Sequence, residues 1–433
     1  MSQFIFKYKL KQETPLIHFQ HSEEGAILRS SEVKPKLDKF IIEQYGGENE
    51  VRKLYNYWFI DGDHPAFKYK MRFIVDGIPT KSDTIETEKK RIQPNGSKNK
   101  VLPKNPINAN YFGNMVDLKN CRTPEEKYAA IERSYKETIF YSNSNSTIRM
   151  EIVCFIPELM EELNKHIIAF FLLNNFGTRQ NKGFGSFTVT HKEDQKLNYN
   201  PISIIKEYFK HRFFVVNNNS SNPMEDIRKL YKLMKSGVNQ NGEYFRAFIY
   251  IYMHKKGIGN EKAKMKQKNI VPIVGKKSNT SKHECDKPPK FDAYKYVRAM
   301  LGIGDNVSYL NAVNPENGRP VPGGKTTVNI SHKESKENEK IERYASPIVF
   351  KIVDKRIIIL PYAVNNHIFN QKFMFDNKKV NLEIFTPEFF DMDDFMLAYK
   401  DYINVEIREQ LIKSKEVKFH GRIDSEEVGG ASK

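Results

Sequence analysis

Strict alternation of apolar and polar residues predicts strands in the first half of the chain. Every second residue from Phe4 to Leu10 is apolar, and the same period recurs over Phe67–Val75 and Thr147–Phe155. Alternation of this kind is typical of a strand with one buried face. A fourth, shorter strand is predicted over Ser186–Thr190.

Helical spacing of apolar residues predicts two helices among these strands. One covers Lys34–Gln44, and the other runs from Pro157 to about Asn174, with proline in its first turn. The resulting order is strand, helix, strand, strand, helix, strand, as in the ferredoxin-like fold. Residues 76–146 are rich in Pro, Gly, Asn and Lys and are predicted to form a long insertion.

A second unit is predicted to begin near Pro201. Ile202–Phe214 and Asp226–Met234 look helical, and Phe389–Arg408 is a further helix candidate. Ile348–Val353 and Arg356–Leu360 are predicted to pair as a hairpin around Asp354-Lys355.

These elements predict an α+β protein of two ferredoxin-like (RRM-like) βαββαβ units with long insertions. The first unit is residues 1–195, and the second, more divergent one is residues 196–420. Residues 255–290 are predicted to be a basic loop or arm and not a packed element, and residues 302–342 are predicted to be loop-like. The small, polar residues of 421–433 are predicted to be a disordered tail.

The net charge of the chain indicates which kind of partner it binds. The 433-residue chain has 70 Lys and Arg against 53 Asp and Glu, a formal net charge of +17. Such an excess favours a polyanionic partner, of which nucleic acid is the commonest, although a lysine-rich solvated surface would give the same total. Within residues 255–290, lysines far outnumber acids.

The remaining composition excludes several classes of protein. The longest apolar run, Ile167–Leu173, is far shorter than the roughly 20 residues that a membrane-spanning helix needs. The N-terminus lacks a secretory pattern, and three scattered cysteines fit a reducing compartment, so we expect a cytoplasmic protein without a membrane contact. His283 and Cys285 lack a second ligand pair, and neither a metal nor a cofactor is predicted.

The sharpest local motif is FGTRQNKGFGS at residues 176–186, between the second helix and the fourth strand. Gly177, Gly183 and Gly185 allow close backbone approach to a ligand, and Arg179 and Lys182 add positive charge. We predict that this loop contacts RNA phosphates. The alternative is a helix C-cap at Gly177 followed by an ordinary turn.

This loop resembles the glycine-rich loop of RAMP proteins, the repeat-associated RNA-binding proteins of CRISPR systems. Two further segments resemble the first RAMP subunit of Cmr-type (type III-B) effector complexes. They are Thr14-Pro15-Leu16 with the later Leu28-Arg29-Ser30-Ser31, and the R-x-x-SP segment of residues 343–348.

The resemblance implies a non-catalytic RNA-binding subunit that contacts CRISPR (guide) RNA, target RNA or both, for antiviral defence. The implied partners are these RNAs and other RAMP subunits of a type III complex. Besides the loop, the RNA-binding residues that we predict are Arg29, Lys34, Lys36 and Arg343.

A second hypothesis is a metal-independent endoribonuclease of the same superfamily that processes CRISPR RNA. His18 and His21 follow the first strand and would act as general acid and base, with Lys34 or Lys36 beside the phosphate. The plainer interpretation of these histidines is two loop residues, one packed and one solvated.

Overall fold

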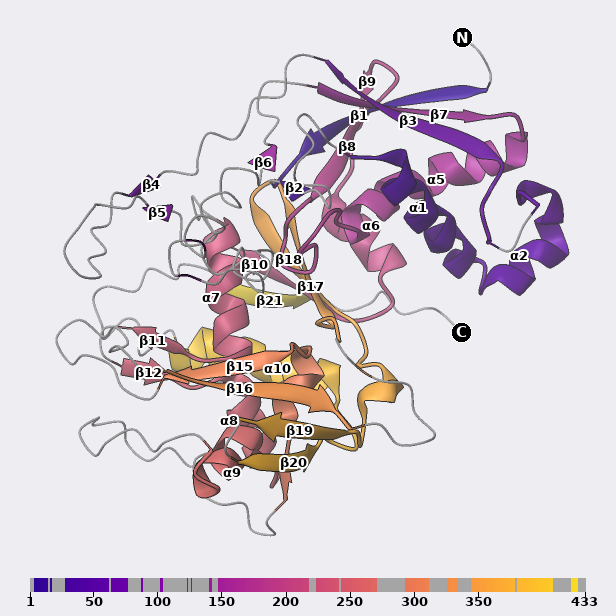
Figure 1. The fold of residues 1–433 in the computed structure, drawn as a ribbon. Coiled ribbons are helices and arrows are strands. Elements are labelled where there is room, and N and C mark those ends of the chain that lie inside the picture. Colours follow the sequence, from indigo (N-terminus) through magenta and orange to yellow (C-terminus); the bar gives the residue numbers. More distant parts are fainter. Residues whose placement is uncertain are drawn as a thin grey trace.

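The described part of the chain contains three sheets of four or five strands, which lie one below another with helices between them (Figure 1). This computed structural model describes residues 4–14, 16–17, 28–61, 64–76, 147–217, 223–240, 243–270, 293–310, 325–333, 344–377, 380–407 and 422–426, together with 87–88, 102–103, 123, 126, 140–141 and 341. The predicted mixture of helices and antiparallel sheets is confirmed.

The N-terminal sheet has the strand order β3-β7-β1-β8-β9, with antiparallel neighbours. Its strands are β1 (Ile5–Gln12), β3 (Tyr69–Asp76), β7 (Thr147–Cys154), β8 (Phe187–Lys192) and β9 (Gln195–Lys196). Helices α1 (Ser30–Gln44) and α5 (Pro157–Leu173) share its hydrophobic core. The predicted order of these strands and helices is confirmed.

Alternation in β1 separates the two faces of this sheet. Tyr8 and Leu10 are buried toward the helices, whereas Lys7 and Lys11 are exposed. In register, Lys7 and Arg72 both lie opposite Glu151 of β7, so these charges share the outer face. The outer face is therefore charged at its centre.

Helix α1 begins at Ser30, four residues before the predicted start at Lys34. Pro35 therefore lies inside the helix. The additional turn is held by a contact from outside. Glu32 accepts a hydrogen bond from the backbone amide of Gly177 at 2.6 Å, and Val33 is fully buried. Helix α2 (Glu48–Tyr55) and the short helix η1 (Asn56–Trp58) follow α1.

The second sheet has the order β17-β18-β10-β21. Its strands are β10 (Phe213–Asn217), β17 (Ile348–Val353), β18 (Arg356–Pro361) and β21 (Arg422–Glu426). The predicted hairpin is confirmed, and both turn residues, Asp354 and Lys355, have positive φ, at 47° and 66°.

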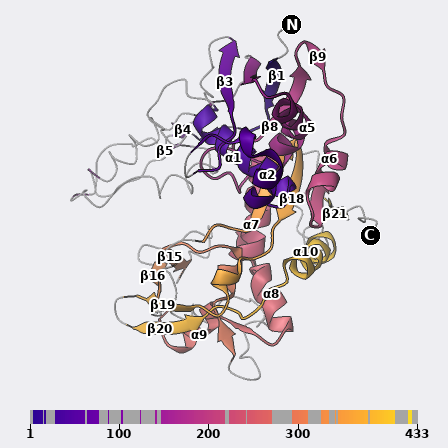
Figure 2. The ribbon, with the colours of Figure 1, turned by 90° about the vertical axis from the view of Figure 1, so that its right-hand side faces the viewer.

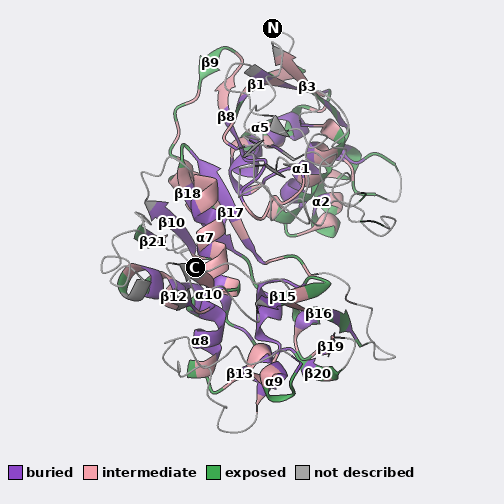
Figure 3. Cartoon of the chain, turned by 60° about the vertical axis from the view of Figure 1, so that its left-hand side comes forward, coloured by how far each residue is buried: buried purple, intermediate pink, exposed green. Residues whose placement is uncertain are grey.

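Both faces of β10, β17 and β18 are largely buried (Figure 3). Phe213 and Val215 of β10 belong to the core beneath the N-terminal sheet, and Phe214 and Val216 belong to the core of the C-terminal part. Alternate residues of one strand therefore join two hydrophobic cores. In the described part of the chain, neither face of these three strands is open in the way that an RRM-type RNA platform needs.

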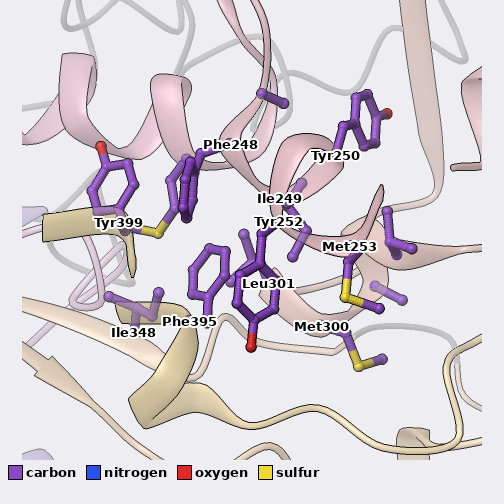
Figure 4. Close-up of a cluster of buried hydrophobic side chains, with 14 of the residues drawn as sticks. Phe248, Ile249, Tyr250, Tyr252, Met253, Met300, Leu301, Ile348, Phe395 and Tyr399 are labelled. Atoms are coloured by element: carbon purple, nitrogen blue, oxygen red, sulfur yellow. The ribbon is translucent and has the colours of Figure 1, made fainter. Parts of the chain in front are cut away.

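The third sheet lies in the C-terminal part and has the order β15-β16-β19-β20. Aromatic residues of α8 (Phe248–Lys255) pack against α10 (Met392–Asp401), with Phe248 and Phe395 rings 5.5 Å apart (Figure 4). The strands are β15 (Asn306–Leu310), β16 (Lys325–His332), β19 (Lys372–Asp376) and β20 (Asn381–Phe385).

The remaining helices are α6 (Pro201–Tyr208), α7 (Pro223–Lys235), α8 (Phe248–Lys255), α9 (Glu261–Gln267) and α10 (Met392–Asp401). Short helices are η3 (Val297–Leu301), η4 (Asn366–Ile368) and η5 (Tyr402–Ile407). Two-stranded pairs are formed by β2 (Leu16–Ile17) with β6 (Phe140–Tyr141), β4 (Thr87–Glu88) with β5 (Leu102–Pro103), β11 (Val238–Gln240) with β12 (Glu243–Phe245), and β13 (Gly259–Asn260) with β14 (Tyr294–Lys295).

Two expected irregular segments contain regular structure instead. Arg422–Glu426, expected in a disordered tail, forms β21 beside β10, and Figure 2 shows it close to α10. Its Ile423 is buried, which explains why the segment is held. Part of the segment expected to be loop-like, residues 302–342, pairs as β15 and β16.

The basic stretch 255–290 begins as packed structure, not as a loop. Helix α9 starts at an Asn260 cap and buries Glu261 and Met265. Glu261 accepts hydrogen bonds from Arg298 Nε at 2.5 Å and the Tyr250 hydroxyl at 2.8 Å. These buried partners fix the helix despite its lysines; residues 271–290 lie outside the described part.

The strand β10 was expected to be the end of a helix over 202–214. Helix α6 ends at Tyr208, and Phe213–Asn217 is the strand. A short apolar run buried on both faces has no period that separates strand from helix. Among the described residues, no helix is long and apolar enough to cross a membrane.

Candidate nucleic-acid interface

The glycine-rich loop lies between the N-terminal sheet and β17 of the second sheet. Helix α5 ends at Leu173 with an extended cap at Asn174, so Gly177 is not its C-cap. The loop closes on itself, because the Phe176 amide donates to the Gly185 carbonyl at 3.0 Å. Its two ends are held by one buried lysine of β17, Lys351, whose Nζ donates to the carbonyls of Asn174 at 2.9 Å and Phe187 at 3.2 Å.

Packing requires glycine at positions 183 and 185. Both have positive φ, 84° and 66°. A Cβ at Gly185 would lie 1.9 Å from the Phe176 carbonyl oxygen, and one at Gly183 would lie 2.7 Å from Ile227 Cδ1. Both glycines are buried, so the structure differs from the expected open loop with exposed amides.

Hydrogen bonds attach the loop to Thr14, which follows β1, and to β17. On the N-terminal side, Thr14 Oγ1 donates to the Gly183 carbonyl at 2.6 Å. On the other side, Ser186 Oγ donates to the Ile352 carbonyl at 2.6 Å, and the Phe350 amide donates to the Asn181 carbonyl at 3.1 Å. The amide of Gly177 is also used, by Glu32. Because these backbone groups already have partners within the protein, a phosphate at this loop would contact the loop side chains and not the backbone amide of Gly177.

One of the two predicted loop cations, Lys182, lies against α7, and the other, Arg179, lies close enough to act on its charge. Lys182 Nζ is 3.4 Å from the centroid of the Tyr231 ring. Burial holds the pKa of Lys182 well below its ordinary value, and the positive charges of Lys235 and Arg179 lower it further. We call Arg179, Lys182 and Lys235 the junction cluster.

Lys235 is the member of this cluster that sequence reasoning missed. Its Nζ donates to the carbonyls of Leu301 at 3.0 Å and Gly302 at 2.6 Å. Burial, with the Arg298 charge, lowers its pKa to about 7. The spacing of Tyr231 and Lys235, four residues apart on one helix, places both on one face and was the available signal.

The predicted cations of α1 contact protein groups. Lys34 Nζ donates to Asp38 at 2.7 Å and to the Phe67 carbonyl at 2.9 Å. Burial raises the pKa of the Asp38 carboxyl, and the Lys34 charge opposes that rise.

Lys36 joins α1 to the glycine-rich loop. Its Nζ donates to the Asn175 carbonyl at 3.1 Å and to Gln180 Oε1 at 2.8 Å. Burial lowers the pKa of Lys36, and Glu32 opposes that fall. Arg29 lies next to this site, as the N-cap residue of α1. His18, His21 and Arg343 lie outside the described residues.

Comparison with known families gives one decisive result. Residues 3–238 match the model of the Cmr1 N-terminal domain, and residues 244–419 match that of the Cmr1 C-terminal domain. The chain belongs to the Cmr1 family. The resemblance to the first RAMP subunit of the Cmr type is thereby confirmed.

Solved structures similar to this Cmr1-family chain are distant. The crystal structure of Cmr1 from Pyrococcus furiosus in its apo form has 11% sequence identity and a TM-score of 0.40, with 98% of each chain covered. A chain in the cryo-EM structure of the type III-B Cmr-beta bound to cognate target RNA and AMPPnP has 12% identity and a TM-score of 0.26, covering 77% of this chain and 72% of that one. No curated protein matches the sequence.

Proposed function

We propose that this Cmr1-family chain is a non-catalytic RNA-binding subunit of a type III-B CRISPR effector complex. It contacts guide RNA, target RNA or both, and its protein partners are other RAMP subunits. The observation that carries the proposal is the junction cluster. The positive charges of Lys235 and Arg179 both lower the pKa of the half-buried Lys182, and a bound phosphate would relieve this repulsion.

The position of the cluster suits a contact that orients RNA. Arg179 and Lys182 come from the glycine-rich loop, and Lys235 is the last residue of α7, which packs against β18 of the second sheet. A phosphate held between them would touch the loop and α7 at once. Phosphate contacts of this kind position a nucleic acid without reading its sequence.

We infer also that both units are ferredoxin-like, with the boundaries 1–195 and 196–420 extended at the C-terminus to include β21. The core strand orders β3-β7-β1-β8 and β17-β18-β10-β21 support this inference. In each, the first strand lies between the third and the fourth in chain order, as in a βαββαβ unit. The third sheet is then an insertion into the second unit.

The test replaces the two loop cations while keeping their apolar stems. We expect the double variant Arg179→Gln/Lys182→Met to bind single-stranded RNA more weakly. The slope of log K against log salt should become shallower by about 1.4, or 0.7 for each lost phosphate contact. Fluorescence anisotropy at several salt concentrations measures both quantities.

The matched control is Lys39→Met/Lys53→Met, which removes two exposed lysines from α1 and α2. It should leave the slope almost unchanged. If both double variants shift the slope equally, or if the loop variant binds like the wild type, the junction cluster is not the RNA site.

A further inference from the structure

A surface pocket outside the junction brings together three segments of the second unit. Its volume is about 390 Å³, and its walls are residues 211–212 after α6, residues from Pro361 to Phe369 after β18, and residues from Phe389 to Asp393 at the start of α10. The volume falls in the range of small-molecule sites. None of the predicted RNA-binding residues that the structure describes lines it.

Two exposed aromatic side chains line this pocket. Phe389 is 71% exposed and Tyr362 is 38% exposed. The neighbouring Phe390 is buried and packs on Phe395, with ring centroids 5.2 Å apart, whereas among the described residues Phe389 has no ring partner. The Tyr362 ring rests edge-on against Phe209 at 5.2 Å. The pocket thus offers aromatic surface on which a flat ring can stack.

Charge in the pocket differs from that of the junction cluster. Arg212 Nε is paired with the Asp393 carboxylate at 3.2 Å. Asp391 adds a second carboxylate, whose Oδ1 accepts the Asp394 amide at 3.0 Å as the cap of α10. His211 also lines the pocket. With two carboxylates against one guanidinium and one imidazole, the pocket favours hydrogen-bond donors over a phosphate group.

We propose that this pocket binds one unstacked base of single-stranded RNA. Phe389 and Tyr362 supply stacking, and the carboxylates of Asp391 and Asp393 accept from an exocyclic amino group. Cytosine, adenine and guanine carry such a group and uracil does not, so the pocket prefers amino-bearing bases. This inference rests on the proposed function, because it assumes that RNA reaches the chain.

The first test is Phe389→Ala, with Phe155→Ala as its control. Phe155 is 73% exposed but lies beyond the end of β7, far in sequence from every segment of the pocket. Loss of one stacked base should weaken binding of short oligocytidylate about tenfold without changing the salt slope. Phe155→Ala should bind normally. Equal effects of the two variants would overturn the proposal.

The second test concerns the choice of base. Asp391→Asn keeps the helix cap, because asparagine caps as well as aspartate, but it replaces the charged acceptor. The preference of the wild type for oligocytidylate over oligouridylate should shrink several-fold in this variant. An unchanged preference, or no preference in the wild type, would contradict the assigned role of the carboxylates.

Photo-crosslinking separates this inference from the proposed function. Free 5-iodocytidine monophosphate, irradiated with the full-length chain, should label Tyr362 or Phe389, and mass spectrometry locates the label. Labelling should persist in Arg179→Gln/Lys182→Met even where that variant has lost RNA affinity. If the chain binds RNA through the junction cluster while the pocket stays unlabelled, the proposed function stands and the pocket is no base site. A Phe389→Ala variant that binds RNA normally but fails to join other subunits assigns the pocket to a protein contact instead.

Discussion

At the residue scale, Gly185 shows how one missing side chain shapes the junction. Its φ of 66° is unfavourable for other residues, and a Cβ there would meet the Phe176 carbonyl oxygen. We expect Gly185→Ala to lower the free energy of unfolding by about 3 kcal/mol, from left-handed backbone and overpacking together. Chemical denaturation measures the change. Gly304→Ala is the control, because its Cβ would meet nothing within 4 Å; a similar loss in both variants would refute the packing argument.

We expect the stability of the protein to depend on pH, because Lys351 is buried in the folded chain. Burial lowers its pKa from 10.5 to about 7 in the folded chain. Between these values the unfolded chain holds a proton that the folded chain has released, so stability rises as the pH increases from about 7 toward 10.5. Lys235 contributes in the same window. Lys182, whose pKa is also lowered, adds to the rise. Lys351→Met should therefore reduce the slope without removing it, whereas exposed Lys39→Met should leave it unchanged; equal slopes in all three proteins would contradict this.

At the element scale, β21 is a small strand with a large expected effect. It forms one edge of the second sheet, and its Ile423 is buried among residues of the C-terminal core. A chain that ends at His420 loses this strand and exposes Phe214 and Val216 of β10. We expect a clear fall in melting temperature. A chain that ends at Glu426 keeps the strand and should melt like the full chain, and equal melting of both truncations would show that β21 contributes nothing.

The elements that the sequence predicted correctly are those whose burial has a simple period. Alternation in Phe4–Leu10 and the helical stripe of α5 each expose one face, so the pattern identifies the element. Strand β10 is buried on both faces, and α9 is held by Arg298, which is distant in the sequence. The local sequence pattern therefore predicts neither element. For the same reason, the sequence alone shows that Arg179 and Lys182 share one loop, whereas the nearness of Lys235 and the enclosure of Gly183 depend on contacts with α7.

At the scale of the whole molecule, the types of side chain in the junction cluster favour RNA binding over RNA cleavage. The junction cluster consists of lysine and arginine, and it holds no histidine among the described residues to take a proton from a ribose hydroxyl. We expect the isolated chain to leave a CRISPR-repeat RNA hairpin uncut in EDTA, as seen on a denaturing gel. Cutting that disappears in His18→Ala or His21→Ala would establish the endoribonuclease hypothesis instead.

Strand β10 is buried on both sides, and this affects how the chain folds during synthesis on the ribosome. Strand β10 ends at residue 217, but its neighbour β18 starts only at residue 356. At common elongation rates, about 10 seconds of translation separate the two strands. During that interval the nascent chain carries Phe213–Val216 without a sheet partner, although the N-terminal core can already cover Phe213 and Val215. The apolar side chains on the other side of β10, Phe214 and Val216, stay uncovered until most of the polypeptide has been synthesised. We therefore expect chaperones that recognise exposed apolar segments to bind this nascent chain.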